Sequence, residues 1–181
     1  EYPRLWAKKC SLRLATSRFR GKSNVVFNAY ALRSPNEGTV GKDWSYGISA
    51  EYPNDLLQME FMLRDIQQNF KPSLGFVSRS NVRMLRVGGR FNPRPKDFLG
   101  LQQFFNGVYY TRFTRLDNGQ VESWQAHFTV PLDWHFKSGD AIHSLMDPEM
   151  AYERLFVPFQ ISPGVFLPVG EYHFTRWRTF V

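Results

Sequence analysis

Apolar and polar residues alternate with a period of two through much of this chain, and no other feature constrains its fold as strongly. The alternation is clear over residues 44–52, 57–64 and 123–132. Because successive side chains of a β-strand point to opposite sides, the pattern predicts strands with one apolar and one polar face. The candidates for the apolar side, facing lipid or a core, are Leu57, Met59, Phe61, Leu63, Trp124, Phe128 and Val130. The candidates for the polar side, facing a lumen or solvent, are Gln58, Glu60, Arg64, Ser123, Gln125, His127 and Thr129.

Turn-forming residues separate the alternating runs at short intervals. Asp117-Asn118-Gly119 supplies the positive φ angles that a tight hairpin needs. Tight turns alternate with longer polar loops, which is typical of an up-and-down meander. We therefore predict an all-β, antiparallel domain over residues 1–181. About nine strands are expected, at residues 11–20, 25–33, 42–52, 56–65, 76–91, 100–116, 120–132, 155–160 and 171–181.

Two further expectations concern the helix content and the ends of the chain. One short helix is predicted near residues 147–154, where Asp147 could cap it and Pro148 would occupy its first position. The sequence begins and ends within strand-like patterns, so we expect it to be a fragment of a longer chain.

Two architectures fit one-sided strands of this kind. Several apolar faces run for nine residues, the length of a tilted strand that crosses a membrane. Aromatic residues make up 17% of the chain, and Trp44, Tyr52 and Trp124 lie near strand ends, where a membrane barrel has its aromatic girdles. A soluble antiparallel sheet with one face on a core would show the same alternation. The alternation by itself does not separate the two.

Two stretches of the sequence carry a resemblance to a known family. Residues 69–79 read Asn-Phe-Lys-Pro-Ser-Leu-Gly-Phe-Val-Ser-Arg and are followed by Phe-Asn-Pro-Arg-Pro at 91–95. The second stretch covers residues 153–161 and 167–172. Together they resemble the C-terminal, outer-membrane-barrel-like region of a bacterial envelope family of uncharacterised activity. Members of this family carry an N-terminal carbohydrate-binding-like sandwich, to which nothing in this sequence corresponds.

The resemblance extends from about residue 43 to the end of the chain. It implies part of a barrel wall in the outer membrane or periplasm of a diderm bacterium, with a role as a pore, import component or envelope scaffold and a link to carbohydrate. The residues of the matched motif are Phe70, Pro72, Gly75, Phe76 and Arg79. Pro72 and Gly75 suit a turn. For Arg79 we favour a structural role, capping carbonyls or pairing with an acid, over contact with an anionic ligand.

Catalytic, metal and cofactor sites find little support in the sequence. The four histidines are scattered without metal-binding spacing, and Ser144 lacks the glycine elbow of a serine hydrolase. Gly88-Gly89 has no nucleotide-cradle spacing and instead favours a bulge or a close backbone contact. We therefore predict no enzyme activity, no catalytic residue, no metal and no cofactor.

The net charge of +7 leaves three readings open. Arg79 and Arg83 share one parity on the predicted fifth strand, and Arg86 and Arg90 share the other, so these arginines form no single nucleic-acid stripe. The remaining readings are contact with anionic lipid head groups and a cationic lumen. We therefore expect membrane lipid, and other chains that complete the sheet, as partners, and no nucleic acid.

The predicted function is a non-enzymatic outer-membrane barrel component. The alternative is a soluble β-sheet accessory or interaction subunit of a larger envelope assembly.

Overall fold

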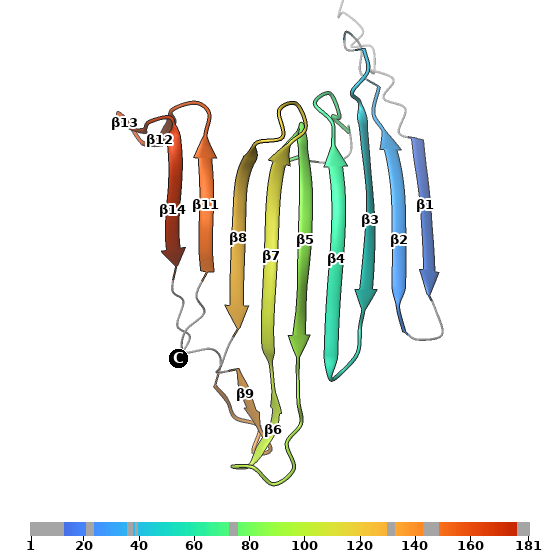
Figure 1. Cartoon of the computed structure of the whole chain (residues 1–181), viewed down its shortest axis with the longest axis vertical. Helices are drawn as coiled ribbons and strands as arrows, with labels where there is room; N and C mark the ends of the chain where they lie inside the picture. Colours follow the sequence, from blue (N-terminus) through green and yellow to red (C-terminus); the bar gives the residue numbers. More distant parts are fainter. Residues whose placement is uncertain are drawn as a thin grey trace, which may run out of the picture.

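A computed structural model of the chain describes residues 13–20, 24–35, 38, 40–72, 76–129, 133–142 and 149–176. Its main feature is one nine-stranded sheet in the order β1-β2-β3-β4-β5-β7-β8-β11-β14, shown in Figure 1. All neighbouring strands in it are antiparallel. Their bounds are Arg13–Arg20 (β1), Val26–Arg33 (β2), Trp44–Tyr52 (β3), Leu57–Ile66 (β4), Val82–Phe91 (β5), Asn106–Arg115 (β7), Val121–Thr129 (β8), Glu149–Leu155 (β11) and Gly170–Arg176 (β14). This arrangement confirms the predicted all-β antiparallel meander.

Two small sheets lie outside the main one. Strands β6 (Leu101–Phe104), β9 (Trp134–Phe136) and β10 (Ala141–Ile142) form a three-stranded sheet below β7 and β8 in Figure 1. Strands β12 (Phe159–Ser162) and β13 (Val165–Leu167) form a hairpin within the connection that leads from β11 to β14. None of the described residues forms a helix, so no membrane-spanning helix is found among them.

The predicted helix near residues 147–154 is wrong, because residues 149–155 form strand β11. This strand pairs with β8 on one side and with β14 on the other. Backbone hydrogen bonds to two neighbours therefore replace those that a helix would have made within the segment. The proposed capping residues, Asp147 and Pro148, lie outside the described residues.

Several predicted strand limits also change. The run predicted at 100–116 is divided at Phe105, whose N–H donates to the carbonyl of Asp133 (2.9 Å), and β6 pairs with β9 instead of joining the main sheet. The strand predicted from residue 76 begins only at Val82, directly after Asn81, whose φ of 61° lies in the left-handed region. The run predicted at 155–160 contains the end of β11 and the start of β12.

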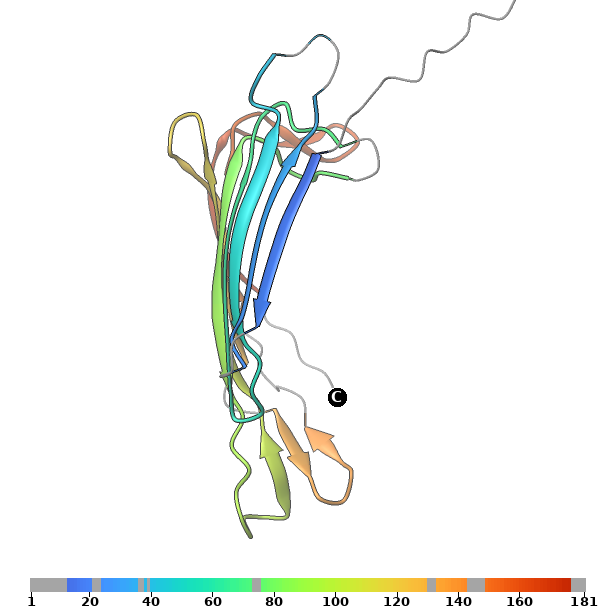
Figure 2. The same cartoon turned by 90° about the vertical axis from the view of Figure 1, so that its right-hand side faces the viewer.

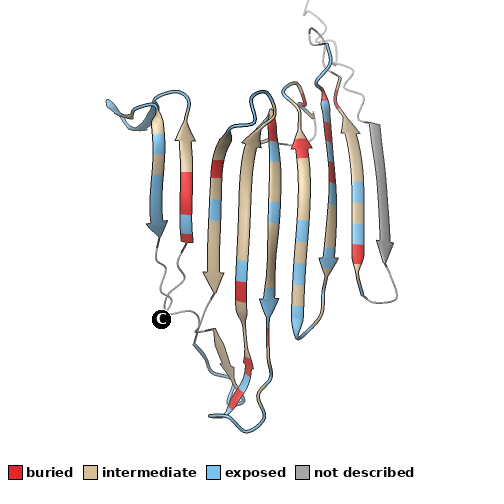
Figure 3. Cartoon of the chain, viewed as in Figure 1, coloured by how far each residue is buried: buried red, intermediate tan, exposed pale blue. Residues whose placement is uncertain are grey.

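The main sheet is a single curved layer with open edges. Within the described residues, β1 pairs only with β2, and β14 pairs only with β11. Figure 2 looks from the β1 side and shows the sheet bent, with the β4–β5 loop on the inside of the bend. Buried positions are few and lie mainly toward the strand ends, as Figure 3 shows. The largest fully buried side chains are Leu101, Val82, Asn92 and Ser34.

Candidate functional site

The register of the main sheet assigns every described strand residue to one of two faces. Directly paired residues of neighbouring strands have their side chains on the same face, and the face alternates along each strand. Phe61, for example, pairs with Ala50 and Val87, whereas its neighbour Glu60 pairs with Glu51 and Gly88. We call the side of Phe61 the apolar face and the side of Glu60 the polar face.

The predicted residues fall on these two faces as follows. Leu57, Met59, Phe61, Leu63, Trp124 and Phe128 lie on the apolar face. Gln58, Glu60, Arg64, Ser123, Gln125, His127 and Thr129 lie on the polar face. Val130 lies outside the described residues. The structure therefore gathers the two predicted sets, from β4 and β8, on opposite sides of one sheet.

Large apolar side chains on the apolar face are exposed rather than covered. Phe27 is 51% exposed, Ile48 52% and Met59 52%. Further exposed members of the same face are Leu57, Phe61, Phe91, Val108 and Met150. Exposed apolar patches of this kind on a soluble protein mark a surface that something else covers.

Charged and aromatic side chains border the apolar face at its upper end in Figure 1. Asp65 on β4 is buried and accepts two hydrogen bonds from Arg83 on β5 (2.8 and 2.7 Å). Beyond this pair, Trp44 begins β3 and lies under the guanidinium of Arg33, 5.5 Å from its ring centroid. The apolar side chains therefore end at a boundary where charge and aromatic rings appear together.

The polar face contains a hollow of about 400 Å³ over the centre of the sheet. We call it the Tyr109 hollow. Its lining comes from β4, β5, β7 and β8 and consists of Glu60, Arg86, Arg90, Tyr109, Thr111, Gln125, His127 and Thr129. All eight belong to the polar face by register. Four of them, Glu60, Gln125, His127 and Thr129, are among the predicted polar-face residues.

Tyr109 is placed in this hollow by a missing side chain on the neighbouring strand. Tyr109 pairs with Gly88, and a Cβ added to Gly88 would come 2.2 Å from the Tyr109 Cδ1 atom. A Cβ added to Gly107 would meet the same ring at 3.1 Å. The Tyr109 ring therefore lies directly against the backbone of the sheet, in space that is free only because Gly88 and Gly107 have no side chains.

Two arginines flank the Tyr109 ring. Gly88 lies midway between Arg86 and Arg90 on the same face of β5, and their guanidinium carbons lie 5.9 and 5.7 Å from the ring centroid. Arg86 also forms an ion pair with Glu60 across β4 and β5. Cation–π contact of this kind restricts where the guanidinium groups can lie. The hollow thus carries two oriented cations and one carboxylate.

A second tyrosine repeats this arrangement toward the β1 edge. Tyr30, Gly47 and Arg64 are neighbours across β2, β3 and β4 on the polar face. A Cβ on Gly47 would come 2.9 Å from the Tyr30 Cε1 atom, and Arg64 lies 5.8 Å from the Tyr30 ring centroid. A tyrosine over a glycine, with an arginine against the ring, therefore occurs twice on this face.

The structure places Arg79 on the polar face, although it comes from the β4–β5 loop. Its guanidinium forms ion pairs with Glu122 and Glu153 (3.5 Å each) and donates a hydrogen bond to Ser123. It also lies 4.6 Å from the Phe113 ring centroid. Because this loop lies on the inside of the bend in Figure 2, the polar face is the inner side of the curved sheet.

The other described residues of the matched motif differ in their surroundings. Phe70 is buried, and its N–H donates to the carbonyl of Gln67 (3.2 Å). Phe76 is 92% exposed. Pro72 lies in the β4–β5 loop, and Gly75 lies outside the described residues.

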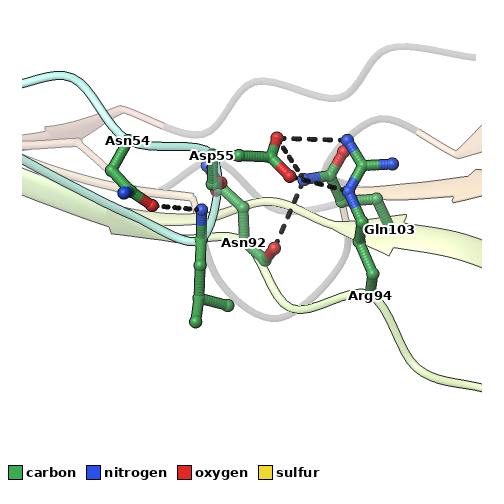
Figure 4. Close-up of polar contacts among 6 residues, drawn as sticks. Asn54, Asp55, Asn92, Arg94 and Gln103 are labelled. Atoms are coloured by element: carbon green, nitrogen blue, oxygen red, sulfur yellow. Dashed lines mark hydrogen bonds and ion pairs between the residues drawn. The ribbon is translucent and has the colours of Figure 1, made fainter.

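A polar cluster holds the loops together at the opposite end of the sheet, as Figure 4 shows. Asp55 accepts hydrogen bonds from Arg94 (2.8 and 3.1 Å) and from Gln103 (3.4 Å). The hydrogen bonds from Arg94 and, to a smaller extent, from Gln103 hold the pKa of Asp55 below its ordinary value. Asn92, almost fully buried, donates to the carbonyl of Asp55 (3.2 Å). The cluster ties the β3–β4 turn to the start of the β5–β6 loop.

The sequence pattern missed the central residues of the hollow. The shared parity of Arg86 and Arg90 and the unusual Gly88-Gly89 pair were visible, but neither identified Tyr109 as their partner. Tyr109 comes from another strand, in a stretch where Val108, Tyr109 and Tyr110 are all apolar or aromatic and hide the alternation. A signal was available in the glycines, since strand glycines often mark a close approach by a neighbouring side chain.

Within the described ranges, no three His, Cys, Asp or Glu side chains come together as a metal site. Comparison with protein-family models, with curated proteins and with solved structures yields no significant match to this chain. The functional argument therefore rests on the chemistry of the two faces.

Proposed function

We propose that this chain forms part of the wall of an outer-membrane β-barrel in a diderm bacterium, with its apolar face toward lipid and its polar face toward water. The observation that carries the proposal is the exposed apolar face of a single-layer sheet. In a soluble protein this face would need a second layer to cover it, whereas acyl chains would cover it in a membrane. The resemblance to the envelope family points to the same role.

The strand lengths suit this role. The central strands β3, β4, β5, β7 and β8 contain 9, 10, 10, 10 and 9 residues. A tilted strand of about 9–11 residues crosses the hydrocarbon layer of a bilayer. The Asp65–Arg83 pair and Trp44 would then lie near the head groups, where charge and aromatic rings are favourable.

The polar, inner face supports a passive role as a pore, import component or scaffold. Its hydrogen-bonding and charged side chains require water or one another, which a lumen provides. The edges of the sheet add a condition. Within the described part of the chain, β1 and β14 each lack a partner on one side. Unpaired backbone groups are costly in lipid, so these edges need further strands, from more of the same polypeptide or from partner chains.

Spin labelling tests which medium covers the apolar face. Cys10 is the only cysteine, so a Cys10→Ser background allows single cysteines to be introduced at Met59 and Phe61 and, as matched controls on the same strand, at Gln58 and Glu60. In reconstituted lipid vesicles, labels at 59 and 61 should be relaxed by oxygen, which concentrates in the bilayer. Labels at 58 and 60 should be relaxed by a water-soluble nickel complex.

The opposite results would overturn the proposal. If labels at 59 and 61 respond mainly to the nickel complex in vesicles, the apolar face is not in lipid. If the chain stays monodisperse without detergent and does not associate with vesicles, the soluble accessory subunit becomes the better function.

A further inference from the structure

The Tyr109 hollow has the composition of a binding site, which the role of a barrel wall does not by itself require. Its central feature is a positively charged side chain, Arg90, that has no acidic partner among the described residues. Arg90 is exposed, and among the described residues no carboxylate forms an ion pair with it. Most other arginines of the main sheet and its adjoining loops do pair with acids, namely Arg33, Arg79, Arg83, Arg86, Arg94, Arg115, Arg154 and Arg176.

The guanidinium of Arg90 is held in place without being neutralised. It lies against the ring of Tyr109, 5.7 Å from the centroid, and that ring is fixed across Gly88 and Gly107. Aromatic contact restricts the side chain but leaves the guanidinium donors available for an oxyanion. An arginine that is already oriented loses less conformational entropy when it binds a ligand.

The rest of the hollow offers neutral hydrogen-bonding groups. Thr111, Gln125 and Thr129 line it from β7 and β8, and Thr129 contacts the His127 ring nitrogen (3.4 Å). Glu60 is the one carboxylate of the lining, and it is paired with Arg86. Hydroxyl and amide groups opposite a cation suit a ligand with one acidic group and several polar groups. A volume of about 400 Å³ is large enough for a molecule of monosaccharide size.

We propose that the Tyr109 hollow binds small oxyanionic ligands, whose carboxylate or phosphate contacts Arg90 while their neutral polar groups contact Thr111, Gln125 and Thr129. Tyr109 acts as a positioning residue for the two arginines. The site goes beyond the role of a wall, and it depends on the polar face only. It would therefore exist whether lipid or protein covers the apolar face.

Calorimetric titration of the whole chain tests the site with three probes: glucuronate, inorganic phosphate and neutral glucose. Glucuronate or phosphate should bind measurably in the millimolar range, and glucose should bind more weakly than both. Tighter binding of glucuronate would assign a sugar acid, and tighter binding of phosphate would assign a phosphate group. Arg90→Gln should weaken the binding of the preferred anion about tenfold, the loss expected for one hydrogen bond between charged groups.

The matched control is Lys96→Gln, which removes one exposed positive charge from the β5–β6 loop, outside the hollow. It should leave the affinity of the preferred anion within about twofold of the wild-type value. Arg90→Lys retains the positive charge and replaces Arg90→Gln in the experiment if that variant does not fold. It should weaken binding less than Arg90→Gln, which removes the charge. Equal weakening by the Arg90 and Lys96 variants, or no anion binding by the wild-type chain, would overturn the site. Neither result affects the lipid-accessibility experiment, so the two proposals fail separately.

Discussion

Gly88 should be intolerant of even one added methyl group, because the Tyr109 ring occupies the space where a side chain would begin. In a Gly88→Ala variant the new Cβ would lie 2.2 Å from Tyr109 Cδ1, 2.9 Å from Tyr109 Cε1 and 2.9 Å from the carbonyl oxygen of Val108. Gly88 is not among the positive-φ glycines, so alanine meets no backbone strain there. The penalty is therefore steric and requires the ring to move.

The expected loss of unfolding free energy follows from these contacts. Overpacking a filled site costs about 1–3 kcal/mol. Replacing glycine where the backbone tolerates a side chain gains about 0.4–1 kcal/mol from the unfolded state. The net destabilisation by Gly88→Ala should therefore be about 1–2 kcal/mol. Gly170→Ala on β14 is the matched control, since the atoms nearest to its Cβ would belong to the Tyr172 side chain, at an ordinary van der Waals distance of 3.7–3.8 Å. We expect that variant to be neutral or slightly more stable.

Urea unfolding followed by tryptophan fluorescence, in one buffer or detergent for all variants, measures these differences. A double-mutant cycle with Tyr109→Ala identifies the cause. Once the ring is removed, Gly88→Ala should cost less, with a coupling energy of about 1 kcal/mol or more. Equal stabilities of the Gly88 and Gly170 variants, or a penalty that is unchanged in the Tyr109→Ala background, would refute the placement of Tyr109 over Gly88.

Three further predictions concern the apolar face, the loop cluster and the sheet edges. Phe128→Arg on the apolar face should cost about 2–4 kcal/mol in a bilayer, and Thr129→Arg on the polar face much less; equal losses in urea unfolding from vesicles would contradict a one-sided strand. Since the pKa of Asp55 is lowered in the folded chain, its bond to Arg94 should stabilise the fold above the unfolded pKa of about 3.9 and lose that effect as the pH falls through the lower folded value. The stability difference between wild type and Arg94→Gln should therefore shrink below about pH 4, and a difference that stays constant in acid would argue against the cluster. The isolated 181-residue chain should give no stepwise conductance in planar bilayers, because the outer edges of β1 and β14 have no partner strand among the described residues; stable channels would show that the chain closes by itself or as an oligomer.

The fold class and the division of residues between the two faces could be predicted from the sequence because they depend on local geometry. In an extended chain, side chains alternate whatever the partner strand is. Leu57, Met59, Phe61 and Leu63 therefore had to share one side of β4. The same local reasoning failed at residues 147–154, where capping signals predicted a helix. There the pairing of β11 with β8 and β14 outweighed the local preference.

The Tyr109 hollow was decided by the tertiary structure, since it depends on which residues become neighbours across strands. Arg86, Gly88 and Arg90 follow one another along β5, but their partner Tyr109 is brought beside them by the register of β7. A shift of that register by one residue would turn Tyr109 to the apolar face and leave the two arginines without a ring between them. The alternation along each strand shows on which face a side chain lies. Only the hydrogen-bonded pairing of strands determines which side chains meet there.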